Sequence, residues 1–451
     1  MKLNIMNKTL KSAILSLFIL CVCSYPLWGQ TGQIKDIIDR EYQEIEKLYK
    51  HFHAHPELSN EEAETSERLA GELEHLGFSV TEGVGGHGIV AVLENGEGPV
   101  VMVRADMDAL PIKEETGVSF ASDKTVTTSE GESVPVMHAC GHDMHMSVMV
   151  GTAQVFTSLM EQWEGTLVLI GQPAEEKLSG ARAMIEDGLF ERFPLPDYIL
   201  GLHVNSAQAS GKVGYSPGYA YANVDVGRIV VKGRGGHGAY PDLTIDPVVI
   251  ASRLVLNLQT IISREISALD PANITIGSIH GGTSGNIIPN EVELELVFRT
   301  LNDDTREKLI KRINEMSEGT GLSAGLPEED WPRLELESDS HVSSVYNTPA
   351  LGERLKNSFA RAVGAENVHE ISPLMYGEDF GEYGSAKPEI PAFLYSLGSV
   401  KPEDMEAAEK GLIVPPSTHS SKYLPDMEPT IRTGILTMSS AVFDLLEGED
   451  N

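Results

Sequence analysis

Cysteine is scarce in this chain, which has only Cys21, Cys23 and Cys140 among its 451 residues. We expect the first two to be removed with an N-terminal segment, which would leave Cys140 alone in the mature chain. A single cysteine cannot form an intramolecular disulfide, so a disulfide-stapled fold is excluded even in an oxidising compartment. The thiol of Cys140 therefore needs another reason to be present.

Basic residues are few relative to acidic ones. Lys and Arg together number 34 and Asp and Glu 67, which gives a formal net charge of −33. Such a surface repels nucleic acid and anionic lipid, so we expect no nucleic-acid partner. The net charge does not determine the field inside a cleft, where bound metal ions can dominate.

Long apolar runs are also missing. The run at 13–22 is shorter than the roughly 20 residues that a membrane-spanning helix needs. Three lysines precede it and polar residues resume near Gln30, which is the layout of a secretory signal. We predict a signal peptide at 1–30, export to the periplasm or the cell exterior, and no stable membrane insertion after cleavage. The alternatives are a membrane anchor helix and a lipid-modified Cys21 or Cys23.

The first half of the chain has the pattern of a sheet covered by helices. Between residue 34 and about residue 221, helical spacing alternates with short apolar runs, at 100–103, 166–170 and 198–202. This alternation is typical of a parallel sheet with helices on its faces. Polar and acidic residues directly follow each run, where the carboxyl ends of such strands form ligand sites.

A second pattern begins near Asn223 and predicts one antiparallel sheet with two helices. The expected strands are 224–232, 274–279 and 292–299, and the expected helices are 247–262 and 303–317. Helices and a strand at 392–395 return after residue 351, as if the first domain were completed after an insertion.

We therefore predict an α/β fold with two domains. Residues 31–221 and 337–451 would form a helix-covered, mostly parallel sheet. Residues 222–336 would form a smaller inserted α+β domain of ferredoxin-like type. Internal repeats and low-complexity tracts are absent from the sequence.

The strongest chemical signal is the run 137–145, Met-His-Ala-Cys-Gly-His-Asp-Met-His. It brings one thiol and three imidazoles together, and these are ligand types that borderline-soft divalent metals prefer. A lone cysteine or histidine would more often be an ordinary buried or surface residue, but the clustering favours a metal site. We expect Cys140 and His142 to be ligands, and His138 and His145 to be neighbours that pack or stay exposed.

Acidic residues follow two of the predicted strands. Asp106 and Asp108 come after 100–103, and a carboxylate there can fix the tautomer of a metal-bound histidine. The alternative is that they only end a strand and start a turn. Glu175 and Glu176 come after 166–170. Two such carboxylates can have different roles, since one can bind a metal while the other accepts a proton.

Two further histidines fall in comparable places. His203 ends the run 198–202, and His419 lies in a polar turn far downstream. Taken together, these motifs resemble the aminoacylase and carboxypeptidase superfamily of two-metal hydrolases, in the branch of hippurate hydrolases and indole-acetyl-amino-acid hydrolases. The resemblance covers about 51–419 and rests on the runs 53–57, 104–111, 138–143, 172–176, 235–239, 286–289, 377–380 and 419–421.

The resemblance implies a centre of two divalent metal ions, zinc or manganese in the first place and cobalt or nickel as alternatives. Cys140 would bridge both ions. His142 and His203 would complete one site, and Glu176 and His419 the other.

The resemblance also implies the residues that act on the substrate. Glu175 would be the general base and acid, and Asp108 would orient a ligand histidine. His237 would stabilise the oxyanion and, with Asn286 and Arg299, bind the substrate. In some family members the inserted domain reaches the site across a dimer, so a homodimer through this domain is an expected arrangement.

Departures from the family pattern are Lys177, Leu178 and Ser179 in place of the usual glycines, Tyr376 in place of a glycine, and a longer stretch at 122–134. None replaces a metal ligand, so they put the substrate in doubt rather than the hydrolysis.

The expected function is metal-dependent hydrolysis of the amide bond of N-acyl amino acids or related small conjugates. A metallo-carboxypeptidase or dipeptidase is the alternative, and Cys140 and His203 argue for the amidohydrolase branch. A protein that only binds metal or substrate is the third possibility, and the presence of Glu175 argues against it.

Overall fold

The structure is a computed structural model that describes residues 27–127, 131–338, 340–386 and 389–448. Residues 1–26 of the predicted signal peptide lie outside the described part, and residues 27–30 open the first described helix. Within the described residues, no helix combines the length and apolarity needed to cross a bilayer.

The larger domain is built on an eight-stranded mixed sheet whose four central strands, β6, β3, β7 and β18, run parallel. Antiparallel pairs extend it beyond β6 and β18. In spatial order the strands are β1 (Ser79–Val84), β2 (Gly88–Asn95), β6 (Gly165–Gln172), β3 (Val100–Asp106), β7 (Tyr198–Ala209), β18 (Ala392–Val400), β8 (Val213–Tyr215) and β17 (Val368–Glu370).

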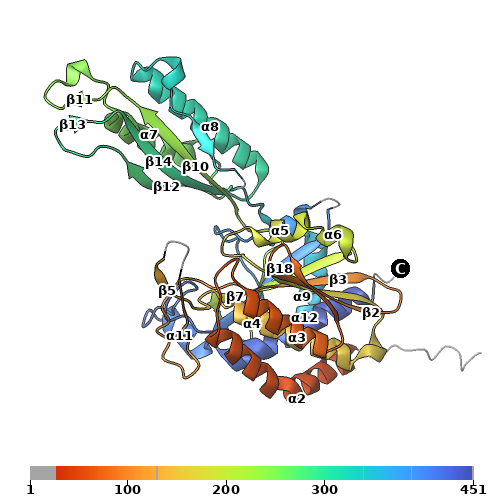
Figure 1. Cartoon of the computed structure of the whole chain (residues 1–451). Helices are drawn as coiled ribbons and strands as arrows, with labels where there is room; N and C mark the ends of the chain where they lie inside the picture. The colour runs from red at the N-terminus through yellow and green to blue at the C-terminus, as the bar shows by residue number, and fades with distance from the viewer. Residues whose placement is uncertain (1–26, 128–130, 339, 387–388, 449–451) are drawn as a thin grey trace, which may run out of the picture.

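Both faces of the central strands are buried, which explains the uninterrupted apolar runs of β3, β6 and β18. In β3, Val101 and Val103 pack into one apolar core and Met102 into the other. Figure 1 shows α2, α3 and α4 on one face and α5 and α6 near the other. The helices are α2 (Leu27–Ala54), α3 (Ala63–His75), α4 (His142–Ser158), α5 (Gly180–Glu186), α6 (Leu189–Arg192), α9 (Pro349–Val363), α10 (Gly381–Ser385), α11 (Pro402–Glu409) and α12 (Met427–Leu446).

The smaller domain is an antiparallel four-stranded sheet with two helices, and its strand order is β12, β14, β10, β15. Helix α7 begins where the Asp246 side chain accepts a hydrogen bond from the N–H of Val248, with Pro247 in the first turn. The elements are β10 (Asn223–Lys232), α7 (Pro247–Arg264), β12 (Ala272–His280), β14 (Glu291–Thr300), α8 (Asp303–Ser323) and β15 (Leu334–Leu336).

Three two-stranded pairs complete the described strands. One of them, β9 with β16, lies where the chain enters and leaves the small domain, and pairs Tyr221 with Val345. The strands are β4 (Thr125–Thr127) with β5 (Ser133–Pro135), β9 (Gly218–Tyr221) with β16 (Val345–Asn347), and β11 (Gly236–His237) with β13 (Ile287–Ile288).

The predicted fold class is confirmed, since a helix-covered, largely parallel sheet is joined to a smaller α+β unit. Details differ from the prediction. The helix expected at 303–317 continues to Ser323, because buried Thr320 and Gly321 keep it packed for a further turn. The sequence pattern predicted a parallel sheet, but it did not predict that β2 and β8 pair antiparallel with β6 and β18.

Candidate metal centre

The candidate metal-binding residues gather at the carboxyl edge of the parallel strands. Asp106 is the last residue of β3, Gln172 the last of β6, and His203 lies on β7 beyond its pairing with β3. Cys140 and His142 come from the turn that begins α4, where Gly141 has a positive φ of 83°. The fold thus brings four separate segments to the edge where such sheets bind ligands.

Two groups of potential ligands share Cys140. One consists of Cys140, His142 and His203, and the other of Cys140, Glu176 and His419, with the ligand atoms of each group within 4.8 Å of one another. The Sγ of Cys140 lies 3.5 Å from Nε2 of His203, and Nε2 of His419 lies 3.3 Å from Oε1 of Glu176. This is the grouping that the resemblance implied for a two-metal centre with one bridging residue.

The free atoms of this cluster fit a cation. His142 Nε2 and Glu176 Oε1 are buried and have no hydrogen-bond partner among the described residues. The other ring nitrogen of His142 lies 2.8 Å from the backbone oxygen of Asp108 and 3.3 Å from its carboxylate. A carboxylate in this place fixes the ring so that Nε2 faces inward, which is the role that the sequence suggested for Asp108.

The electrostatic environment also suits positive ions. Burial alone would lower the pKa of His142, but Asp106 and Asp108 raise it to about 10. Burial and the carboxylates of Glu176 and Glu175 raise the pKa of the Cys140 thiol. A bound cation reverses this effect and stabilises the thiolate, so metal binding should release a proton.

Glu175 is buried beside the cluster, with a carboxylate oxygen 3.8 Å from His142 Nε2. Burial is the main cause of its pKa lying well above the usual range, and the charges of Glu378 and Glu176 add to it. A carboxyl with a raised pKa next to a metal-binding group is placed to exchange protons at neutral pH.

A network of buried ion pairs adjoins the centre. The sequence suggested a role for its member Asp106 but did not reveal the network. The guanidinium of Arg104 pairs with Asp106 at 2.7 Å, with Glu378 at 2.9 Å and with Asp379 at 3.2 Å. Asp106 also accepts a hydrogen bond from Nδ1 of His145 at 2.5 Å. Asp106 and Glu378 both lie close enough to His203 to form a third potential ligand group.

The ion-paired residues Arg104, Asp106, Glu378 and Asp379 lie within two of the runs that carry the family resemblance. The pair of Arg104 with Glu378, however, joins β3 to a segment 274 residues away. His138 and His145 are both buried rather than exposed. His145 is fully partnered, since its Nε2 accepts the N–H of Val204.

A second set of buried, hydrogen-bonded side chains lies at the start of α4. His53 bridges two carboxylates, with Nδ1 at 2.7 Å from Asp143 and Nε2 at 3.0 Å from Glu114. Asp143 follows His142 directly in α4, so this group fixes the start of that helix.

The predicted substrate residues of the small domain are not brought to the metal cluster of their own chain. His237 on β11 and Asn286 before β13 are exposed, and Figure 1 places this hairpin at the end of the small domain far from the main sheet. Arg299 on β14 lies instead at the junction of the domains, where it donates to the backbone oxygen of Met375 at 3.2 Å.

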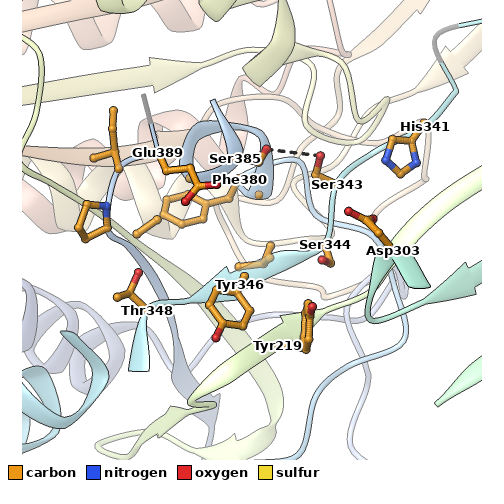
Figure 2. A pocket seen from close by; sticks show the side chains of 16 residues that line it. Tyr219, Asp303, His341, Ser343, Ser344, Tyr346, Thr348, Phe380, Ser385 and Glu389 are labelled. Carbon is orange, nitrogen blue, oxygen red and sulfur yellow. Dashed lines mark hydrogen bonds between the residues drawn. The ribbon is translucent and has the colours of Figure 1, made fainter. Parts of the chain in front are cut away.

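A separate cavity of about 690 Å³ lies at the junction of the two domains. Figure 2 shows the rings of Tyr219 and Tyr346 on one side and the hydrogen bond between Ser385 and Ser343 on another. Ala392, at the beginning of β18, is among the residues that line this cavity, whereas the metal cluster lies at the carboxyl edge of the sheet. The described residues that line it include none of the predicted site residues.

The fold and this ligand set define a two-metal hydrolase. The chain belongs to the Peptidase family M20/M25/M40, whose sequence profile matches residues 102–410. It is 33% identical to an N-acetylcysteine deacetylase of Bacillus subtilis (strain 168), over 84% of the chain and 94% of that protein. It is 35% identical to the IAA-amino acid hydrolase ILR1-like 4 of Arabidopsis thaliana, over 76% and 74%.

Among solved structures, the chain is similar to the YXEP protein of Bacillus subtilis, described as a dinuclear metal binding peptidase from the M20 family. The identity is 26%, the TM-score is 0.72, and the match covers 91% of this chain and 100% of that one. The family and the hydrolase class expected from the sequence are thus confirmed.

Proposed function

We propose that this protein hydrolyses the amide bond of N-acyl amino acids or related small amide conjugates. The observation that carries the proposal is the sharing of Cys140 by two ligand groups, with Glu175 buried beside them. The names of the deacetylase and the conjugate hydrolase among the relatives support the same substrate class.

The roles of the side chains follow from their positions. Cys140, His142 and His203 would hold one divalent ion, and Cys140, Glu176 and His419 the other. When bound, the ions lower the pKa of a water molecule and polarise the scissile carbonyl. Glu175 would accept a proton from the attacking water and deliver it to the leaving amine.

A substrate panel tests this proposal. N-acetyl, N-benzoyl and N-indoleacetyl amino acids should be hydrolysed in the presence of manganese, zinc, cobalt or nickel, and unmodified dipeptides more slowly. Faster cleavage of dipeptides than of every N-acyl amino acid would favour the carboxypeptidase alternative. Comparison of the four metals would identify the one that supports activity.

We also propose that the active form is a homodimer joined through the small domain. Its edge strand β12 has an unpaired side in the described sheet, and α7 exposes Val248, Val249 and Leu256. Free strand edges and exposed apolar helix faces are typical of surfaces that pair with a second copy. The hairpin with His237 and Asn286 would then reach the metal centre of the partner.

Mixing two inactive variants tests the dimer. Cys140→Ala removes a ligand of both metal sites. His237→Ala removes the proposed oxyanion donor and should lower kcat by about 100- to 1,000-fold. In a mixed dimer one of the two sites has both residues intact. Since random pairing makes about half of the dimers mixed, co-expression should restore about one quarter of the wild-type activity. A mixture as inactive as either parent would argue against a shared site.

We further propose that the protein is exported after removal of residues 1–30. The three lysines before the apolar run 13–22 support this proposal. Mass spectrometry of protein isolated from its host should show a mature chain shortened by about 30 residues. An intact Met1 on protein inside the cell would contradict it.

A further inference from the structure

The turn after β6 carries the predicted general base and has two non-glycine residues in the left-handed region, Ala174 before Glu175 and Leu178 after it. Ala174, directly before Glu175, has a φ of 51°, in the left-handed region. Residues other than glycine are disfavoured there, so the surroundings must hold the backbone in place. The turn is also tight where it closes, since a Cβ on Gly180 would lie 1.6 Å from the carbonyl oxygen of Pro173.

Glu62 makes the contact that holds Ala174. Its side chain is fully buried, at 0% exposure, and Oε1 accepts the N–H of Ala174 at 2.8 Å and that of Asn60 at 2.9 Å. Asn60 also has a left-handed φ, of 69°. Burial raises the pKa of Glu62 to about 7, which reflects the cost of placing a carboxyl in this position. One oxygen therefore fixes two strained residues on different segments.

Two more carboxylates hold the same turn beyond Glu175. Asp108 accepts the N–H of Glu176 at 2.9 Å, and Asp379 accepts that of Ala181 at 3.0 Å. Glu62, in contrast, holds the residue before Glu175, because it accepts the N–H of Ala174. Without Glu62, the strained residue before the base would be released, while the ligand Glu176 would still be held by Asp108.

We propose that Glu62 is a positioning residue, which keeps Ala174 in its left-handed conformation and thereby directs the Glu175 carboxylate toward the metal centre. The proposal rests on the hydrolytic function proposed above. It assigns Glu62 a part in turnover and none in metal binding.

Three variants test this role. Glu62→Met keeps the size but removes the acceptor, and should lower kcat by about 10- to 100-fold, because a displacement of about 1 Å at a catalytic group can cost 100-fold. KM and metal content should stay near wild type. Glu62→Gln keeps a carbonyl acceptor and should remain within about 3-fold of wild type.

The decisive variant is Glu62→Met combined with Ala174→Gly. Glycine adopts a positive φ without strain, so the double variant should recover most of the kcat that Glu62→Met loses. A double variant no faster than Glu62→Met, or a Glu62→Gln as slow as Glu62→Met, would overturn the proposal. Should Glu62→Met fail to fold, replacement of Ala174 by L-lactate deletes the N–H donor while leaving Glu62 in place, and should give the same loss of kcat. A lactate protein with wild-type kcat would also overturn it.

Hydrogen exchange provides a readout that does not depend on activity. In metal-loaded protein, Glu62→Met should speed amide exchange in a peptide spanning 173–181 and leave the α12 peptides unchanged. If wild type hydrolyses none of the amides in the panel, the proposed function fails, but the exchange result still decides whether Glu62 holds the turn. Unchanged exchange in 173–181 would refute the positioning role.

Discussion

Arg104 and Glu378 lie 274 residues apart in the sequence and form a buried ion pair with 2.9 Å between Nη2 and Oε1. Arg104 also pairs with Asp106 and Asp379, so one guanidinium contacts three carboxylates beside the candidate metal centre. Breaking a buried pair leaves uncompensated charge in a low-dielectric interior, which is far costlier than losing a surface pair.

We therefore expect Arg104→Met to lower the free energy of unfolding by about 3–5 kcal/mol. Arg192→Met is a matched control, because Arg192 pairs with Asp187 at 2.8 Å on the surface and should contribute less than about 1 kcal/mol. Urea unfolding of the metal-loaded proteins measures both. Equal losses for the two variants would show that the buried network has no special weight.

Metal stoichiometry should reveal the sharing of Cys140. Cys140→Ala removes a residue of both ligand groups and should reduce bound metal by nearly two ions per chain. His203→Ala and His419→Ala each affect only one of the two groups that share Cys140 and should cost about one ion. Elemental analysis after gel filtration measures the ratio, and loss of only one ion from Cys140→Ala would show that it does not bridge.

The adjacent carboxylates should fail in different ways. Glu176→Gln weakens a metal ligand, so activity should return in part at high metal concentration. Glu175→Gln should keep its metal and substrate binding, yet turn over about 100- to 10,000-fold more slowly, because added metal cannot replace a proton acceptor.

Metal content measured beside the rate separates these outcomes. A Glu175→Gln that loses metal, together with a Glu176→Gln that keeps it, would reverse the two roles.

The pH dependence of stability should report the buried His53. Burial alone would lower its pKa, but the hydrogen bonds to Asp143 and Glu114 raise it to about 9. Because the folded pKa exceeds the unfolded value of about 6.5, the stabilisation is fully present below pH 6.5 and is lost as the pH rises through about 9. The stability difference between wild type and His53→Gln should therefore shrink between pH 6 and pH 9.5. A constant difference over this range would show that His53 is not charged in the folded protein.

The sequence predicted the parts of the site that lie close together in the chain. Cys140 and His142 stand in one short run of metal-ligand residues, and Glu175 comes three residues after the end of an apolar strand, so local pattern and strand order suffice to bring them together. Arg104, Asp106 and Glu378 were visible as motif residues, but their mutual pairing depends on the register of segments far apart in the chain. Such pairings are set by tertiary packing, which local spacing does not encode.

The positions of His237 and Asn286 show a second limit. The resemblance gave them a role at the substrate, but their location depends on how the small domain stands relative to the main sheet and on whether a second chain is present. Neither is determined by residues near them in the sequence. Glu62 escaped notice for a similar reason, because its importance lies in one hydrogen bond to a turn 112 residues away.

The pairing of β9 with β16 has a consequence for how this architecture can be altered. Since Tyr221 lies opposite Val345, the outgoing and returning chain are already neighbours, as in the two arms of a hairpin. A turn of about two residues could join such arms and bypass the whole small domain. The apolar clusters of the two domains are composed of different residues, so the main sheet would keep its own core after such an excision. The small domain is in this sense a module that could be exchanged while the metal centre is retained.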